Sequence, residues 1–239
     1  MANDEAGTEN AGNPSYLFFD TETTGLPKSW KASFSDSGNW PHIVQIAWAL
    51  FDGAGKQIAF RDYIVRPEGF VIPESATAIH GISTEKALRE GCPAAQVLKE
   101  FSEVIRGVAC LVAHNLDFDE KMVRVELLRH GMPDVLQGVP LPINRSVVKT
   151  GAVPVAMDQK KIKAGAVKKI CTMKSSAAYC KIPGPYGNKW PKLSELHVRL
   201  FNVDFQDQHN AASDVLCCAK CFFELKRLAV ICDSPNTPF

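Results

Sequence analysis

Residues 16–22 read Tyr-Leu-Phe-Phe-Asp-Thr-Glu, an almost continuous apolar run that ends in two closely spaced acids. The run predicts a short strand over residues 16–20 that is buried on both faces. In an extended chain, residues i and i+2 point to the same face, so Asp20 and Glu22 project together. Neighbouring carboxylates repel unless a cation neutralises them, and oxygen ligands suit Mg²⁺ or Mn²⁺ rather than zinc. The pair taken alone is best explained as a solvated strand end, because such pairs are common.

The rest of the chain alternates between strand-like and helix-like patterns. Strands are expected at residues 43–51 and 59–65, and the turn sequence Asp-Gly-Ala-Gly between them predicts an antiparallel meander. Apolar spacing and stop signals predict two more strands, at residues 108–113 and 170–173, and helices at residues 73–79, 83–90, 93–106, 118–130, 193–201 and 211–230. Because strands and helices interleave without a linker, we expect a single α/β domain.

The 239 residues divide into three parts. We expect a flexible N-terminal tail over residues 1–15, a globular domain over residues 16–231 with a Lys-rich insertion at about 145–169, and a C-terminal tail over residues 232–239. No apolar run approaches the ~20 residues of a membrane span, and the N-terminus lacks the basic and apolar segments of a signal peptide. The eight cysteines form no disulfide framework, so we expect a cytoplasmic protein.

The net charge of +1 conceals an uneven distribution. Residues 145–192 hold eleven Lys and Arg against one acid, a local charge of +10, which leaves −9 on the remaining chain. Such a segment fits a contact surface for a polyanion. A solvated Lys-rich loop explains the same charge equally well.

Two further acids follow elements that are expected to be buried. Asp119 lies in the first turn of a predicted helix directly after a predicted strand, where the helix dipole favours a carboxylate. Asp214 lies near the start of the last predicted helix, and His209 precedes it in the loop. A neutral imidazole beside an activated water is a suitable general base near pH 7. Each feature alone has an ordinary structural explanation, and only their combination is specific.

Together these residues resemble the DEDDh family of 3′→5′ exonucleases, which includes the epsilon subunit of bacterial DNA polymerase III and ribonuclease T. The matching motifs are FDTETTGL at residues 19–26, AHNLDFD at 113–119 and HNAASD at 209–214, with a His-Gly-Ile element at 80–82. The resemblance covers roughly residues 16–228. One departure is Cys-Thr-Met at residues 171–173, where several members carry Asp-Thr.

The resemblance implies a ribonuclease H-like fold, a mixed sheet flanked by helices. It also implies an enzyme that releases nucleoside 5′-monophosphates from the 3′ ends of single-stranded DNA or RNA. Two divalent cations, Mg²⁺ or Mn²⁺, would be held by Asp20, Glu22, Asp119 and Asp214, and His209 would be the general base. By the same resemblance, the residues expected to bind substrate are Thr23, Gly25, Leu26, His80 and Asn115.

Several alternatives stay open at this stage. A catalytically silent nucleic-acid-binding or assembly module would keep the same fold, and a phosphoesterase for small nucleotides is a weaker rival. Expected partners are a single-stranded 3′ end and a polymerase or repair protein, and the oligomeric state is open, a homodimer included. The aromatic residues of the loop after the first motif, Trp30, Phe34 and Trp40, either stack on unpaired bases or fold back on the domain. Cys217, Cys218 and Cys221 are expected to be small buried residues below the site.

Overall fold

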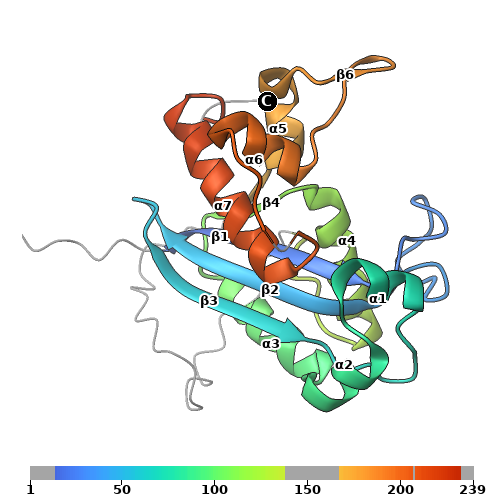
Figure 1. The fold of residues 1–239 in the computed structure, drawn as a ribbon. Helices are drawn as coiled ribbons and strands as arrows, with labels where there is room; N and C mark the ends of the chain where they lie inside the picture. Colours follow the sequence, from blue (N-terminus) through green and yellow to red (C-terminus); the bar gives the residue numbers. More distant parts are fainter. Residues whose placement is uncertain (1–13, 138–166, 207, 233–239) are drawn as a thin grey trace, which may run out of the picture.

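Strand β1 (Pro14–Thr23) lies at the centre of a five-stranded sheet with the order β3-β2-β1-β4-β5. The computed structural model describes residues 14–137, 167–206 and 208–232 (Figure 1). Strands β2 (Ile43–Asp52) and β3 (Gln57–Ile64) form the expected antiparallel meander with β1. Strands β4 (Cys110–Ala113) and β5 (Lys168–Cys171) pair in parallel on the other side. The sheet is therefore mixed, as the resemblance implies.

Strand β1 is longer at both ends than the sequence predicts. It begins at Pro14, inside the segment expected to be a tail, and Pro14 is paired with Asp52. It also continues past Asp20, because Asp20 and Glu22 pair with Ala47 and Gln45 on β2. The two acids therefore stand on a strand with a hydrogen-bonded neighbour rather than on a loop that leaves the sheet.

The helices lie on both faces of the sheet (Figure 1). Helices α3 (Ala94–Ile105) and α4 (Leu116–Arg129) pack with Leu17 and Phe19 of β1 on one face. Helices α5 (Thr172–Cys180), α6 (Leu193–Phe201) and α7 (Ala211–Arg227) pack with Tyr16 and Phe18 on the other. Helices α1 (Glu74–His80) and α2 (Thr84–Glu90) form a smaller cluster with Val44 of β2. One domain accounts for all the described helices and the main sheet.

Two elements between β5 and α6 differ from the sequence prediction. The strand expected at residues 170–173 ends at Cys171, because the hydroxyl of Thr172 turns inward to Ala113 O and helix α5 begins there. A two-residue hairpin, β6 (Pro183–Gly184) and β7 (Gly187–Asn188), then precedes α6. Helix α4 begins at Leu116, two residues before the expected start, with Asn115 at its N-cap position.

Some predictions fall on residues outside the described ranges. Most of the Lys-rich insertion, residues 145–166, is outside them, as are residues 1–13 of the N-terminal tail and residues 233–239 of the C-terminal tail. Among the helices that the structure describes, none is both long enough and apolar enough to cross a membrane.

Candidate active site

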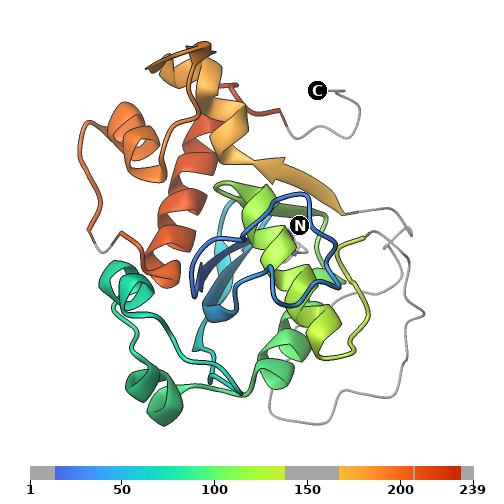
Figure 2. The ribbon, with the colours of Figure 1, turned by 90° about the vertical axis from the view of Figure 1, so that its right-hand side faces the viewer.

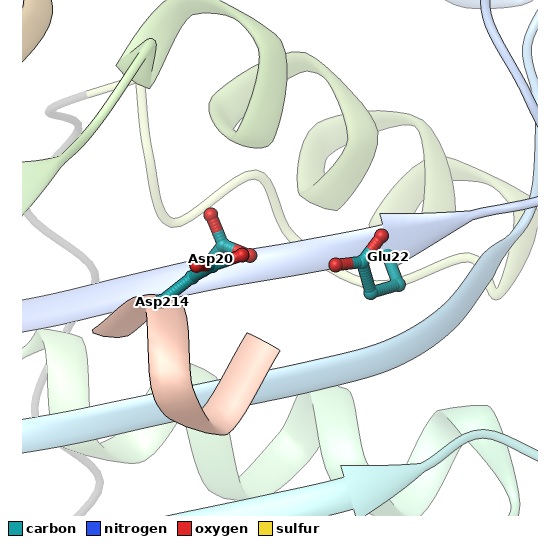
Figure 3. A group of neighbouring side chains, drawn as sticks. All are labelled: Asp20, Glu22 and Asp214. Atoms are coloured by element: carbon teal, nitrogen blue, oxygen red, sulfur yellow. The ribbon is translucent and has the colours of Figure 1, made fainter. Parts of the chain in front are cut away.

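The alternation of β1 sends its acids to the face that α7 covers. Asp20 and Glu22 follow Phe18 at intervals of two, and Phe18 packs against Phe222 of α7. Asp214, in the first turn of α7, meets them there (Figure 3). One carboxylate oxygen from each of the three acids lies within 4.8 Å of the others. The structure thus brings together three of the four acids predicted from the sequence as one possible cation-binding group.

Asp119 reaches the same neighbourhood from the opposite face. It lies in the first turn of α4, is 2% exposed, and accepts hydrogen bonds from the backbone N and the Oγ1 of Thr21, at 3.0 and 2.8 Å. Thr21 stands between Asp20 and Glu22 on β1 but points toward α4. The fourth acid is therefore tied to the strand that carries the first two. No role was predicted for Thr21, because its partner is 98 residues away along the chain.

Burial shifts the pKa values of all four acids upward, and repulsion from neighbouring carboxylates adds to the shift of Asp20, Glu22 and Asp119. Burial is the largest cause for each, raising the pKa of Glu22 to about 7, that of Asp119 to about 8 and that of Asp214 to about 6. The pKa of Asp20 is raised well above its usual value by burial and then by the charges of Asp119, Asp214 and Glu22. Asp20 is therefore the electrostatic centre of the cluster.

No positive side chain offsets this repulsion within the described residues. None of the Lys, Arg or His ion pairs there involves Asp20, Glu22, Asp119 or Asp214. The donor atoms are all carboxylate oxygens, the ligand type that hard divalent cations prefer. The arrangement fits a divalent cation site built from β1, α4 and α7.

His209 lies beside the cluster on an exposed loop. Its backbone N donates to Oδ2 of Asp214 at 3.2 Å, and its φ of 62° is in the left-handed region. Asn210 follows as the N-cap of α7, where its side chain accepts hydrogen bonds from the backbone N of Ala212 and of Ser213. Gln45 of β2 accepts from the backbone N of Ala211, which ties the start of α7 to the sheet. Asn210 and Gln45 were not singled out from the sequence, although each is a common signal: a helix cap and a buried polar residue in a strand.

The residues expected to bind substrate line the exit of β1. Thr23 is 8% exposed, and its Oγ1 donates to the carbonyl of Gly25 at 2.7 Å. Gly25 has a φ of 143°, where a side chain would be strained, and an added Cβ would meet nothing within 4 Å. The side chain of Leu26 is 75% exposed. These residues present a short bare backbone and one exposed apolar side chain near Glu22.

His80 and Asn115 lie on other elements. His80, at the end of α1, is 7% exposed and accepts a hydrogen bond from the backbone N of Ile82 at Nδ1, while its Nε2 makes no hydrogen bond. Burial lowers the pKa of His80 and the nearby backbone of Thr23 opposes that shift, which places the ring near the exit of β1. Asn115 has a φ of 71° and makes no capping hydrogen bond with its side chain.

His114 and Thr172 join three elements behind α4. The two nitrogens of His114 are 2.9 Å from Oγ1 of Thr172 and 2.9 Å from the carbonyl oxygen of Pro191. Because the Pro191 carbonyl can only accept, Nε2 carries the proton and Nδ1 accepts from Thr172. Burial lowers the pKa of His114 to about 4. Thr172 is fully buried and links the end of β4 to the start of α5.

Packing contacts explain the positions of the aromatic residues in the loop after β1 and of the cysteines in α7. Trp40 is 3% exposed and Phe34 packs on it, so both fold back on the domain. Trp30 is 48% exposed but rests edge-on against Phe118. Cys217, Cys218 and Cys221 are buried on α7, as the sequence predicts. Cys218 lies close enough to Asp20 for the carboxylate to contribute to the raised pKa of its thiol, after burial.

Known protein families and solved structures match this chain. A family model described as an exonuclease, RNase T, matches residues 17–222. The chain belongs to the RNase T exonuclease family. The matched range includes all four acids and His209. The candidate site therefore lies within the exonuclease domain that defines the family.

Individual related proteins match a shorter part of the chain than the family model does. The PolC-type DNA polymerase III of Streptococcus sanguinis strain SK36 is 36% identical over 124 residues, 52% of this chain and 8% of the polymerase. The PolC-type DNA polymerase III of Streptococcus thermophilus strain LMD-9 is 33% identical over 124 residues, again 52% of this chain and 8% of the polymerase. The chain thus matches only a small part of these long polymerases.

Solved structures share the fold of this family member. Exonuclease I of E. coli in complex with a dT13 oligonucleotide aligns with a TM-score of 0.62 and 16% identity over 90% of this chain and 42% of that one. Exonuclease I of Methylocaldum szegediense gives a TM-score of 0.62 and 17% identity, over 90% and 40%. These neighbours support the ribonuclease H-like fold expected from the sequence. The family consists of nuclease hydrolases, which agrees with the acidic cluster.

Proposed function

We propose that the protein is a metal-dependent 3′→5′ exonuclease that releases nucleoside 5′-monophosphates from single-stranded DNA. One observation carries the proposal: four carboxylates with raised pKa values gather around Asp20 with no positive partner among the described residues, and His209 stands beside them. The streptococcal relatives are DNA polymerases and exonuclease I was solved with DNA oligonucleotides, which favours DNA over RNA. The same relatives favour a DNA polymerase or repair protein as partner.

In this proposal the acids of β1, α4 and α7 hold two divalent cations, Mg²⁺ or Mn²⁺. Bound there, such cations offset the carboxylate repulsion, lower the pKa of water and stabilise charge on the phosphate. His209, whose backbone N donates to the carboxylate of Asp214, would accept the proton of the attacking water. Thr21 keeps the carboxylate of Asp119 in place during the reaction.

The residues at the exit of β1 position the terminal nucleotide. The bare backbone at Gly25 allows a sugar or phosphate to approach closely, and the exposed Leu26 offers an apolar surface to a base. The buried ring of His80, which lies near the backbone of Thr23, borders this pocket. Asn115, whose side chain makes no capping bond, is a further candidate contact.

The direct test uses single-stranded oligonucleotides labelled at the 5′ end, as DNA and as RNA, with Mg²⁺ or Mn²⁺. We expect a ladder of 5′-labelled products that shorten one nucleotide at a time. Asp119→Asn should reduce the rate about 100-fold or more, because several kcal/mol of transition-state stabilisation depend on the cation site.

Asp117→Asn is the matched control, because Asp117 is in the same first turn but pairs with Lys174 at the surface. It should leave the rate within about twofold of the wild type. Immediate release of a labelled mononucleotide would instead show that hydrolysis begins at the 5′ end. Binding without hydrolysis in either metal would favour the catalytically silent module.

A further inference from the structure

The surface formed by α5 and the β6–β7 hairpin combines lysines with exposed aromatic rings. Residues 168–192 contain six lysines and no acid. At the β6–β7 hairpin the side chain of Tyr186 is fully exposed, and Trp190, just after the hairpin, is 59% exposed. We call this the hairpin surface and define it by Lys174, Lys181, Tyr186, Lys189, Trp190 and Lys192. None of these residues is needed to explain the acidic cluster.

Two contacts join the hairpin surface and the adjacent Pro191 to the start of α4, and a third lies within the surface. Nζ of Lys174 is 2.5 Å from Oδ2 of Asp117, in the turn of α4 that also carries Asp119. The same ammonium lies over the ring of Trp190, 5.8 Å from its centroid. Next to Trp190, the Pro191 carbonyl is held by His114. The base of the surface is therefore fixed against the start of α4.

The surface extends away from the acids along α5. Figure 2 shows α5 running up from the middle of the molecule toward the hairpin, while α1, which ends at His80, lies near the lower end of α7. Helix α5 has nine residues, a length of about 13 Å. At about 3.4 Å per nucleotide that is room for roughly four stacked nucleotides. The hairpin and α1 thus lie near opposite ends of α7.

We propose that the hairpin surface binds the part of a single-stranded polynucleotide that lies upstream of the 3′-terminal nucleotide, with bases stacked on Tyr186 and Trp190 and phosphates held by the lysines. Lysines interleaved with exposed rings are the features by which proteins bind single strands without sequence preference. Stacking on a ring also explains why large aromatic side chains stay exposed here. This inference rests on the proposed function, because it assumes a substrate whose 3′ end lies at Asp20.

The loop between β1 and β2 is a less favourable path for the strand. Its exposed ring, Trp30, already packs edge-on against Phe118, whereas Trp190 makes no ring-ring contact with other described residues. Helix α4 beneath it carries acids at Asp117, Asp119, Glu120 and Glu126. By contrast, Tyr186 makes no ring contact with other described residues, and no acid lies within the segment that carries it.

The test compares the double variant Tyr186→Ala/Trp190→Ala with Trp30→Ala as the matched aromatic control. Fluorescence anisotropy with 5′-labelled dT12 and rU12, with Ca²⁺ in place of Mg²⁺, measures binding without requiring catalysis. We expect the double variant to bind at least one of them about tenfold or more weakly, from ~1–3 kcal/mol per stacked base. Trp30→Ala should bind within about twofold of the wild type. Which oligonucleotide loses affinity identifies DNA, RNA or both as the ligand.

A length series separates this proposal from the proposed function. With Mg²⁺, kcat/KM of the double variant should fall much more for dT12 than for dT3, since dT3 does not reach the hairpin. Tyr186→Phe/Trp190→Phe should restore binding, because the rings stack without their polar atoms. Equal binding by the wild type and the double variant, or no binding of either oligonucleotide to the wild type, overturns the proposal and leaves the surface to a protein partner. If nothing is hydrolysed but the binding difference persists, the proposed function fails and the hairpin surface stands.

Discussion

The two sides of the candidate active site are built in opposite ways. On the strand side, Asp20 and Glu22 belong to a central strand paired on both edges of its buried part, and the carboxylate of Asp119 is held twice by Thr21. On the loop side, His209 is exposed, adopts a left-handed φ, and is linked to the acids through its backbone N. The groups that repel one another are thus fixed by the core, while the proposed proton acceptor stands where water enters.

The largest effect is expected on the strand side, from Asp20→Asn. Asp20 is the centre of the cluster, so the cation site loses its main ligand and activity should fall about 1,000-fold or more. The same change removes a repelled buried charge, so the melting temperature in chelator at pH 8 should rise by about 2–4 °C for each kcal/mol relieved. Mononucleotide release and thermal unfolding measure the two effects. A less active protein that is also less stable in chelator would contradict the electrostatic picture.

A smaller effect, confined to the rate, is expected on the loop side. His209→Asn keeps a residue that tolerates the left-handed φ but removes the imidazole, so the rate should fall about 100- to 1,000-fold. Because the side chain is exposed, the free energy of unfolding should change by less than about 0.5 kcal/mol. The neighbouring Gln208→Ala is the control and should affect neither quantity. If His209→Asn unfolds more easily in urea than Gln208→Ala, the loop is not separate from the core.

The third effect is on the pH dependence of the free energy of unfolding, and it arises at the buried His114. Burial lowers the pKa of His114 to about 4 from the ordinary value of 6.5. A depressed pKa means that the stabilising contribution is complete above pH 6.5 and is lost as the pH falls toward 4. The loss is about 3 kcal/mol, from roughly 1.4 kcal/mol per pKa unit. Urea unfolding at pH 7.5 and 4.5 measures it.

The comparison with His114→Gln isolates this contribution. The raised pKa values of Asp20, Glu22, Asp119 and Asp214 favour folding as the pH falls, but they act equally in both proteins. Wild type should therefore lose about 3 kcal/mol more than His114→Gln between the two pH values. Equal losses would show that His114 is not buried neutral against Pro191.

The parts of the site that depend on local periodicity could be predicted from the sequence. Alternation along β1 places Asp20 and Glu22 on one face, and the start of an apolar helix places Asp214 in a first turn. The meander and the last two helices follow from turn residues and apolar spacing in the same way.

The parts that depend on distant contacts could not be predicted. The hydrogen bonds from Thr21 to Asp119 join residues on different elements. Helix α5 begins at Thr172, whose hydroxyl lies within hydrogen-bond distance of Ala113 and His114, and its sequence alone predicted a strand to residue 173 and no helix after it. The hairpin contains Gly and Pro in a segment without periodicity, where only tertiary contacts select one conformation.

The cysteines of α7 give the molecule an internal reporter of opening. Cys218 is buried beneath Asp20 and the pKa of its thiol is raised, so the reactive thiolate is scarce while α7 lies on the sheet. Its alkylation rate is then set by how often the helix lifts away. Because Asp214 lies on the same helix, a cation bound by Asp214, Asp20 and Glu22 would also hold the helix to the sheet. The alkylation rate of Cys218 would then report whether the proposed cation site is occupied.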